Sequence, residues 1–171
     1  EIEETVFDLL SREIDYGEVF VQSTRSESFG LEDGIVKEGA FSVDGGIGVR
    51  ALAGEKTGFA YSEDIRLDGL QQAAKAARSI AKQGSGRGAP AFNATGYPAL
   101  YEGVDPISSL SDAEKVVLLR QVDGIARAED ARVKEVNVRI SASHETMLVM
   151  ASDGTLAADI RPLVRLDVSV I

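Results

Sequence analysis

Cysteine is absent from the 171-residue sequence, and histidine occurs only once. The absence of cysteine excludes a disulfide framework and a thiol nucleophile. A zinc site made from this chain alone would have to rely on carboxylates, which is uncommon for zinc. The sequence also has no apolar run long enough to cross a bilayer, and its first residues show no targeting signal. We therefore expect a cytoplasmic protein without membrane association.

Acidic residues outnumber basic ones, with 28 Asp and Glu against 18 Lys and Arg, so the formal net charge is −10. Such a surface repels polyanions, and direct binding of nucleic acid is therefore not expected. A cationic or neutral partner fits the charge better. Because 44% of the residues are apolar, the chain can bury a core as one domain or as two small lobes.

Three segments carry apolar residues at helical spacing. Segment 2–14 predicts a short amphipathic helix, and the alanine-rich segment 67–81 predicts a long one. Ser111 and Glu114 form a capping box, in which hydroxyl and carboxylate each bond a backbone N–H, and they predict a second long helix over about 112–130. Segment 84–106 is rich in Gly, Ser, Pro and Asn, which predicts a flexible loop between the two long helices.

The remaining segments alternate apolar and polar residues, as strands do, and they are separated by turn signals. The strongest turn is Asp33-Gly34, followed by the run Asp44-Gly45-Gly46 and by Asp153-Gly154. Pro162 should mark a strand start, a bulge or an edge. The predicted strands are 19–25, 28–32, 35–43, 47–53 and 59–61 before the long helices, and 136–142, 147–151, 155–160 and 164–170 after them.

Strands grouped before and after the helices indicate an α+β fold, with mainly antiparallel sheet packed against two long helices. Both ends of the chain look cut. The chain begins at Glu1 rather than at methionine, and its last strand stops in mid-alternation at Ile171. We expect a chain that is truncated within a strand.

His144 and Glu145 superficially resemble the start of a zincin motif. A zincin helix needs a second histidine one turn later, and position 148 is leucine. We expect His144 on a solvent-facing hairpin. A Ser-His-Asp triad is formally open, but no serine lies in a Gly-x-Ser-x-Gly elbow. No catalytic and no metal-binding residue is therefore predicted.

Two glycine-rich runs, 45–48 and 84–88, lack the order of a phosphate-binding loop, and we interpret them as a turn and a linker. Acidic residues also gather along the first group of strands. Alternation favours a solvated face over a cation site. These acidic residues are Glu27, Glu32, Asp33, Glu38 and Asp44.

Arg50, Arg161 and Arg165 lie among apolar strand residues. A guanidinium in that setting often pairs with a carboxylate of the same chain, and Asp167 and Asp159 are candidate partners. The other interpretation is that these side chains hold a peptide carboxylate or a partner domain. The sequence leaves both open, and the residues that bind substrate are unknown.

Several short sequence segments resemble the TldD/PmbA family, whose members were once labelled modulators of DNA gyrase. They are DYGE at 15–18, LEDGIVK at 31–37, GIGVRA at 46–51, GEKTGFAY at 54–61 and SDGTLAADIRPLVRL at 152–166. The match runs in order across nearly the whole chain and is weakest in the loop.

The resemblance implies the N-terminal region of a zinc metallopeptidase, over residues 1–171, that works with a related subunit of the PmbA (TldE) type. It also implies unfolded peptide substrates, in the maturation of a peptide antibiotic or the degradation of an antitoxin. The family's metal motif is a His-Glu-x-x-x-His helix with a later cysteine in the C-terminal half. No position of this chain matches that motif, so the C-terminal metallopeptidase domain is absent and the fragment should be inactive alone.

Two other hypotheses remain open. The chain could be a non-proteolytic binding module, for example a gyrase-modulating protein that pairs a sheet edge with an extended peptide. It could also be a small hydrolase that uses His144, in which case His144→Ala would abolish activity.

Overall fold

The computed structural model describes residues 14–81, 93–94 and 100–171. The chain divides into two compact units. Unit 1 comprises Glu1–Ser23, Asp44–Leu100 and Thr146–Asp159, and unit 2 comprises Thr24–Val43, Tyr101–Glu145 and Ile160–Ile171. The chain passes between the units inside strands, so several strands contribute residues to both.

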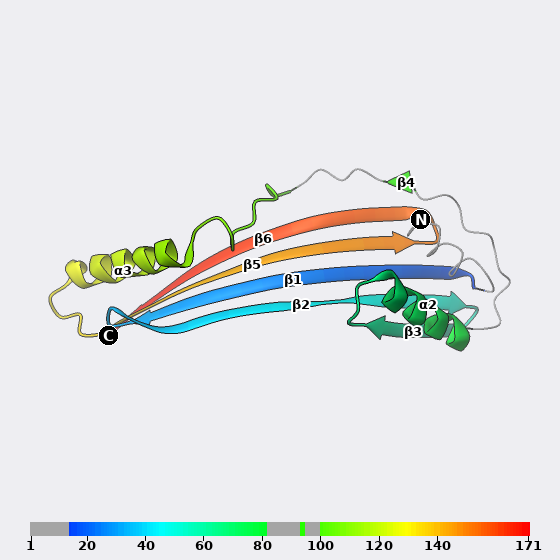
Figure 1. The fold of residues 1–171 in the computed structure, drawn as a ribbon, viewed down its shortest axis with the longest axis horizontal. Helices are drawn as coiled ribbons and strands as arrows, with labels where there is room; N and C mark the ends of the chain where they lie inside the picture. The colour runs from blue at the N-terminus through cyan, green and yellow to red at the C-terminus, as the bar shows by residue number, and fades with distance from the viewer. Residues whose placement is uncertain (1–13, 82–92, 95–99) are drawn as a thin grey trace. The chain divides into compact units, whose positions relative to one another are not determined.

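The strands form one six-stranded sheet in the order β3-β2-β1-β5-β6-β4 (Figure 1). Strands β2 and β3 pair antiparallel, and the short β4 pairs parallel with β6. The predicted α+β class with mainly antiparallel strands is thus confirmed. The strand bounds are β1 Tyr16–Glu32, β2 Ile35–Ala53, β3 Lys56–Ser62, β4 Asn93–Ala94, β5 Val136–Ala151 and β6 Thr155–Val170.

The first group of strands is longer and simpler than predicted. Segments 19–25 and 28–32 are one strand, β1, and 35–43 and 47–53 are one strand, β2. The predicted turn at Asp44-Gly45-Gly46 is wrong. A Cβ at Gly45 would lie 2.8 Å from the carbonyl oxygen of Gln22, and one at Gly46 would lie 3.0 Å from that of Ser62. These glycines allow close approach of neighbouring backbones inside the sheet, not a change of chain direction.

The turn predicted at Asp33-Gly34 is confirmed. Both residues have positive φ, 48° and 76°, which is the conformation that a tight hairpin requires. Gly54, with φ 58°, turns the chain between β2 and β3, and Gly154, with φ 97°, lies between β5 and β6. Among the described non-glycine residues, Asp33 alone has positive φ.

The second group of strands is also longer than predicted. Segments 136–142 and 147–151 are one strand, β5, and β6 runs through Pro162 without a break. Pro162 lies where β6 has no described neighbour except β5, because β4 meets β6 only at Thr155 and Leu156. Within the described residues the position of Pro162 agrees with the edge interpretation, while the predicted break in the strand is wrong.

Unit 1 packs helix α2 (Leu67–Ala81) against β3. The predicted alanine stripe is buried, since Ala74, Ala77 and Ala81 are each 0% exposed. Small side chains let the helix approach the sheet closely, and Gly58 on β3 lies directly under the Ala77 carbonyl. The core of this unit is completed by Ile14, Val19, Ile47, Val49, Leu70 and Met150.

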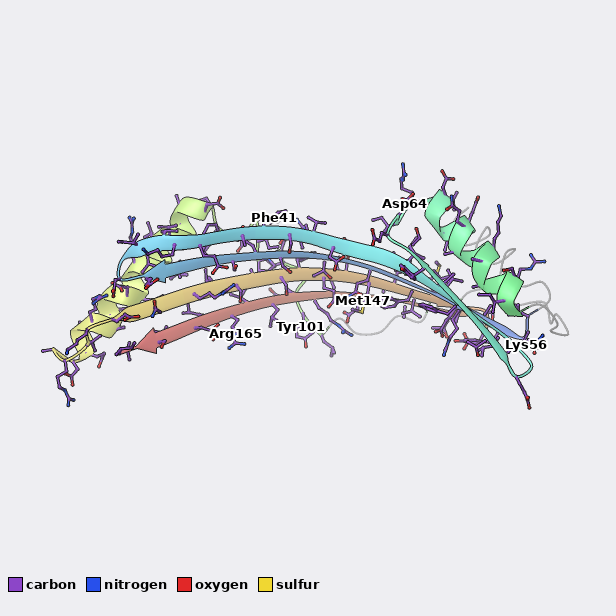
Figure 2. The ribbon with its side chains drawn as sticks, turned by 90° about the horizontal axis from the view of Figure 1, so that it is seen from below. Phe41, Lys56, Asp64, Tyr101, Met147 and Arg165 are labelled. Atoms are coloured by element: carbon purple, nitrogen blue, oxygen red, sulfur yellow. The ribbon has the colours of Figure 1, made fainter. Side chains whose placement is uncertain are left out.

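Unit 2 packs helix α3 (Asp112–Glu129) over β1 and β5. Both bonds of the capping box predicted for Ser111 and Glu114 are present, so the helix start is confirmed. The core consists of Leu31, Leu119, Val136 and Val138, with Phe29 packed against it. The outer strands of this unit are β2, which carries Phe41, and β6, which carries Arg165 (Figure 2).

The helix predicted over 2–14 falls almost entirely outside the described residues. Most of the loop predicted over 84–106 falls outside them too. Within that range β4 is a short strand, and residues 100–106 form neither helix nor strand. None of the described helices is both long and apolar enough to span a membrane.

Candidate functional site

His144 lies in the interior of β5 and is half-buried, so its predicted place on a solvent-facing hairpin is wrong. Its Nδ1 lies 3.4 Å from Nη2 of Arg25 on β1. The polar residues around position 144 do not interrupt the strand, because β1 supplies them with polar neighbours. Thr146, for example, donates to the Ser23 carbonyl at 3.4 Å.

Asp105, close to His144, accepts three hydrogen bonds. Its Oδ2 accepts a hydrogen bond from Arg25 at 2.9 Å and one from the Ser108 hydroxyl at 3.0 Å, and its Oδ1 accepts one from the Ile107 N–H at 3.0 Å. Arg25 thus stands between His144 and Asp105, and Ser108 bonds the aspartate. Among the described residues this is not the Ser-His-Asp order of a triad, because the carboxylate does not orient the imidazole. The cluster fastens the segment before α3 to β1.

The Asp105 contacts predict a pH dependence. Burial raises the pKa of Asp105, but the bonds from Ile107, Ser108 and Arg25 outweigh burial and hold it below the ordinary value of 3.8. The unfolded chain therefore binds a proton first as the pH falls, and the stabilisation is present above pH 3.8 and lost progressively below it. Asp105→Asn should flatten the acid limb of the stability curve, measured by urea unfolding between neutral pH and acid. An unchanged slope would contradict this account.

Lys115 and Glu27 form a buried ion pair in unit 2. Their side chains are 5% and 11% exposed, and Nζ of Lys115 lies 2.5 Å from Oε1 of Glu27. Lys115 also donates to the Ile107 carbonyl at 2.7 Å and sits 5.7 Å from the centre of the Phe29 ring. The prediction that Glu27 belongs to a solvated face is wrong. On β1, the side chains of Glu27, Phe29 and Leu31 share one face by alternation, and that face meets α3.

The other predicted acidic residues are exposed; two of them form ion pairs, and a third accepts a backbone hydrogen bond. Asp33 pairs with Arg127, which keeps the pKa of its carboxyl below the usual range. Glu38 lies 3.1 Å from Arg139. Asp44 accepts a hydrogen bond from the Gly45 N–H at 2.8 Å. These local contacts, with Glu32 exposed at the end of β1, describe a solvated surface rather than a cation site.

Arg50 in unit 1 forms an internal ion pair, which is one of the two interpretations given for this residue. Its Nε lies 2.9 Å from Oε1 of Glu18 and its Nη2 lies 2.9 Å from Oε2, so the contact is bidentate. The Tyr16 hydroxyl also donates to Glu18 at 3.1 Å. Burial and the neighbouring Glu18 raise the pKa of Tyr16. The partner of Arg50 is therefore Glu18, which was not among the candidate carboxylates.

Arg165 pairs with Asp167, one of its two candidate partners, at 2.7 Å between Nη2 and Oδ1. Arg161 also interacts with another group of the chain. The guanidinium groups considered as holders of a peptide carboxylate are thus already engaged by the protein itself.

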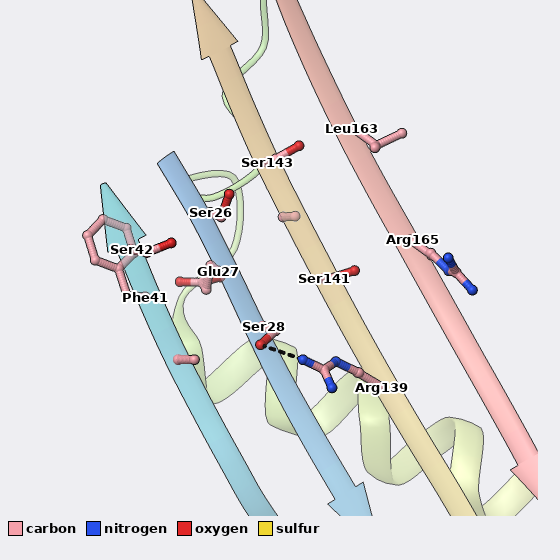
Figure 3. A pocket seen from close by; sticks show the side chains of 12 residues that line it. Ser26, Glu27, Ser28, Phe41, Ser42, Arg139, Ser141, Ser143, Leu163 and Arg165 are labelled. Carbon is pink, nitrogen blue, oxygen red and sulfur yellow. Dashed lines mark hydrogen bonds between the residues drawn. The ribbon is translucent and has the colours of Figure 1, made fainter. Parts of the chain in front are cut away.

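A shallow hollow of about 340 Å³ lies on the face of unit 2 that is opposite α3 (Figure 3). Arg139 bridges its floor, donating to the Ser28 hydroxyl at 3.3 Å and to Glu38 at 3.1 Å. Other serine hydroxyls of the hollow have no hydrogen-bond partner within the described part of the chain. The lining residues are Ser26, Glu27, Ser28, Ala40, Phe41, Ser42, Arg139, Ser141, Ala142, Ser143, Leu163 and Arg165.

This hollow was missed by sequence reasoning. The available signal was serine at alternate positions, 26 and 28 on one strand and 141 and 143 on another, which places the hydroxyls on one face. The hollow offers hydroxyls and guanidinium groups for polar contact. Its described lining residues include no histidine and no cysteine, and their one carboxylate, Glu27, is paired with Lys115.

The zinc site implied by the sequence resemblance has no ligand set here. Within residues 14–81, 93–94 and 100–171, no three His, Cys, Asp or Glu side chains come close enough to hold a metal ion. His144 approaches a guanidinium instead of carboxylates. The residues that the structure describes therefore do not fit a metal centre.

Comparison with protein families identifies two successive domains. Residues 17–81 match the model of PmbA/TldA metallopeptidase domain 1, and residues 105–171 match that of the PmbA/TldA metallopeptidase central domain. The two matches together cover more than half of the chain and leave out most of the segment between α2 and α3.

Curated relatives match nearly the whole chain. A metalloprotease TldD homologue from Haemophilus influenzae is 52% identical over 169 residues, which are 97% of this chain and 35% of the relative. One from Buchnera aphidicola (subsp. Acyrthosiphon pisum) is 44% identical over 165 residues, 96% of this chain and 34% of the relative. The chain thus spans about a third of the length of these relatives.

Solved structures share the fold at low sequence identity. A crystal structure of a candidate modulator of DNA gyrase from Bacteroides thetaiotaomicron superposes with a TM-score of 0.72 at 17% identity, covering 99% of this chain and 40% of that one. TldE from Thermococcus kodakarensis gives 0.67 at 15% identity, covering 99% and 43%. On the family matches and the relatives taken together, the chain belongs to the PmbA/TldD family of metallopeptidases.

Proposed function

We propose that residues 1–171 are the N-terminal, non-catalytic region of a TldD-like zinc metallopeptidase that acts in the cytoplasm on unfolded peptides. The observation that carries this proposal is the 52% identity, over 97% of the chain, to a protein named metalloprotease TldD homologue. The chain spans only 35% of that relative, and the proposal assigns the zinc site and the C-terminal metallopeptidase domain to the remaining length.

The chemistry of the chain favours a supporting role over a catalytic one. It has no cysteine and a single histidine, and the His144 side chain lies beside Arg25. A metal cation would be repelled by that guanidinium. The hollow on unit 2 instead offers polar groups that could bind polypeptides of varied sequence. A related subunit of the PmbA (TldE) type is the proposed partner, in line with the shared fold of the Thermococcus protein.

The test uses the full-length parent protein with its metal. Replacing the first histidine of its His-Glu-x-x-x-His motif should abolish both bound zinc, measured by mass spectrometry of the metal, and cleavage of an unfolded polypeptide. His144→Ala should leave zinc content unchanged, because Nδ1 of His144 faces Arg25. Loss of zinc in His144→Ala would overturn the non-catalytic assignment. Cleavage that survives removal of the motif histidine would overturn the metallopeptidase assignment.

The alternative is a binding module that acts without proteolysis. Open strand edges among the described residues of unit 2 and the name of the Bacteroides neighbour, a candidate modulator of DNA gyrase, favour it. The two functions separate in a pull-down. Capture of gyrase-associated proteins by the parent with its motif histidine removed supports the binding module, while capture that requires an intact motif supports the peptidase.

A further inference from the structure

The hollow on unit 2 carries a local charge opposite to that of the chain. Its described lining residues include two guanidinium groups, Arg139 and Arg165, and one carboxylate, Glu27. Glu27 points toward α3 on the other face of the sheet, where Lys115 neutralises it at 2.5 Å. The hollow is therefore a cationic site in a chain whose formal net charge is −10. A hollow lined by charge of one sign attracts a group of the opposite sign, so an anionic group fits it best.

The carboxylates that pair with these arginines lie outside the hollow. Glu38 and Asp167 line a second hollow of unit 2, of about 410 Å³, and Arg139 lines both hollows. In the second hollow Glu32 is a third carboxylate, against the cations Arg139 and Lys37. The two neighbouring hollows thus differ in charge, and only the first one favours an anion.

Arg139 keeps hydrogen-bond donors available for a ligand. Its contacts with Ser28, at 3.3 Å, and with Glu38, at 3.1 Å, both use Nη2. Its Nε and Nη1 have no hydrogen-bond partner among the residues that the structure describes. The side chains of Arg139 and Glu38 are 51% and 46% exposed, so a ligand can reach the ion pair. A carboxylate is the acceptor that gains most here, because hydrogen bonds between ionised groups are the strong ones.

The serines of the hollow have the spacing of an extended polypeptide. Figure 3 shows Ser26 and Ser28 on β1 beside Ser141 and Ser143 on the neighbouring strand β5. The serines of each strand are two residues apart, so their hydroxyls repeat about every 6.8 Å. Alternate side chains of an extended polypeptide repeat at the same interval. A polypeptide laid along these strands therefore meets a hydroxyl at each step, whereas a compact anion would use only one position.

We propose that this hollow binds an acidic side chain, Asp or Glu, of an extended polypeptide, with Arg139 as the cation and the serine hydroxyls as further donors. This inference rests on the proposed function and names a substrate class for it, unfolded segments that carry acidic residues. Glu38 is then the internal competitor of the substrate carboxylate, because both accept hydrogen bonds from Arg139.

Peptide binding tests the preference on the full-length parent, with the first histidine of its His-Glu-x-x-x-His motif replaced so that the peptide is not cleaved. The probes are a labelled peptide of glycine, serine and glutamate and the same peptide with glutamine for glutamate, and fluorescence anisotropy measures both dissociation constants. The glutamate peptide should bind about fivefold more tightly, the upper range for an ion pair that water reaches. Equal affinity for the two peptides would overturn the proposal.

Two substitutions should move the affinity in opposite directions. Arg139→Gln should weaken binding of the glutamate peptide about fivefold and remove the preference, because the cation is lost. Glu38→Gln should strengthen binding of this peptide about threefold, because Arg139 loses its competing carboxylate. Both variants break the same ion pair, so a purely structural effect would have the same sign in both. The matched control is Arg132→Gln, which removes a 91% exposed arginine outside the hollow and should change neither affinity.

Two further results would contradict the proposal. One is a preference for glutamate that survives Arg139→Gln, and the other is a Glu38→Gln protein that binds the glutamate peptide more weakly. A hollow that is filled by another part of the parent would give equal affinity for both peptides. Cleavage is not measured, so the peptidase assignment can stand without this preference. The preference can also appear in a parent that binds no zinc.

Discussion

Replacing Lys115 with alanine should lower the free energy of unfolding of the chain by about 3–5 kcal/mol, the usual cost of removing one partner from a buried ion pair. Lys115 is 4% exposed and holds Glu27, whose side chain is 11% exposed. Alanine leaves the Glu27 carboxylate without its cation in a place that water reaches poorly. It also leaves the Ile107 carbonyl without its donor. Urea unfolding, followed by circular dichroism, measures the loss.

Two control variants separate the buried charge from loss of a side chain. Arg132→Ala breaks an ion pair with Asp130 whose arginine is 91% exposed, and it should leave stability nearly unchanged, because water screens such a pair. Lys115→Met with Glu27→Leu removes both charges and should recover most of the loss. If the double variant is as unstable as Lys115→Ala, the ion pair is not the cause.

Replacing Gly58 with alanine should destabilise unit 1 by about 3 kcal/mol, at the upper end of the usual cost of overpacking. A Cβ at this position of β3 would run into the carbonyl oxygen of Ala77 in α2 and would lie 3.1 Å from Cβ of Ile80. The first of these atoms belongs to the helix backbone, so relief requires α2 to move away from the sheet. Ala73, Ala74 and Ala77, which are at most 3% exposed, would lose their packing with it.

Gly124→Ala is the matched control for this substitution. Gly124 lies inside α3, and a Cβ there meets nothing within 4 Å. Alanine should therefore raise stability by about 0.5–1 kcal/mol, because glycine is the poorer helix former. Thermal unfolding of both variants measures the contrast. A Gly58→Ala protein as stable as the parent would mean that α2 does not pack closely on β3.

Features that depend on neighbouring residues were predictable from the sequence. Three features depend only on the residue types at positions close in the sequence. They are the capping box at Ser111 and Glu114, the stripe of alanines in α2 and the positive φ at Asp33 and Gly34. The α+β class follows from the order of these segments. The errors at Gly45-Gly46 and around His144 have one origin. A glycine pair or a polar run looks like a turn until the neighbouring strand is known.

Composition alone determined that the chain offers no thiol and a single imidazole. The short sequence stretches that resemble the TldD/PmbA family indicated the family, and the family models match it. Only the tertiary structure decided which charges are buried and which strands are neighbours. Lys115 meets Glu27 across 88 residues and Arg25 meets His144 across 119 residues. Such contacts follow from the pairing of distant strands, and local periodicity records which face a side chain occupies but not what covers that face.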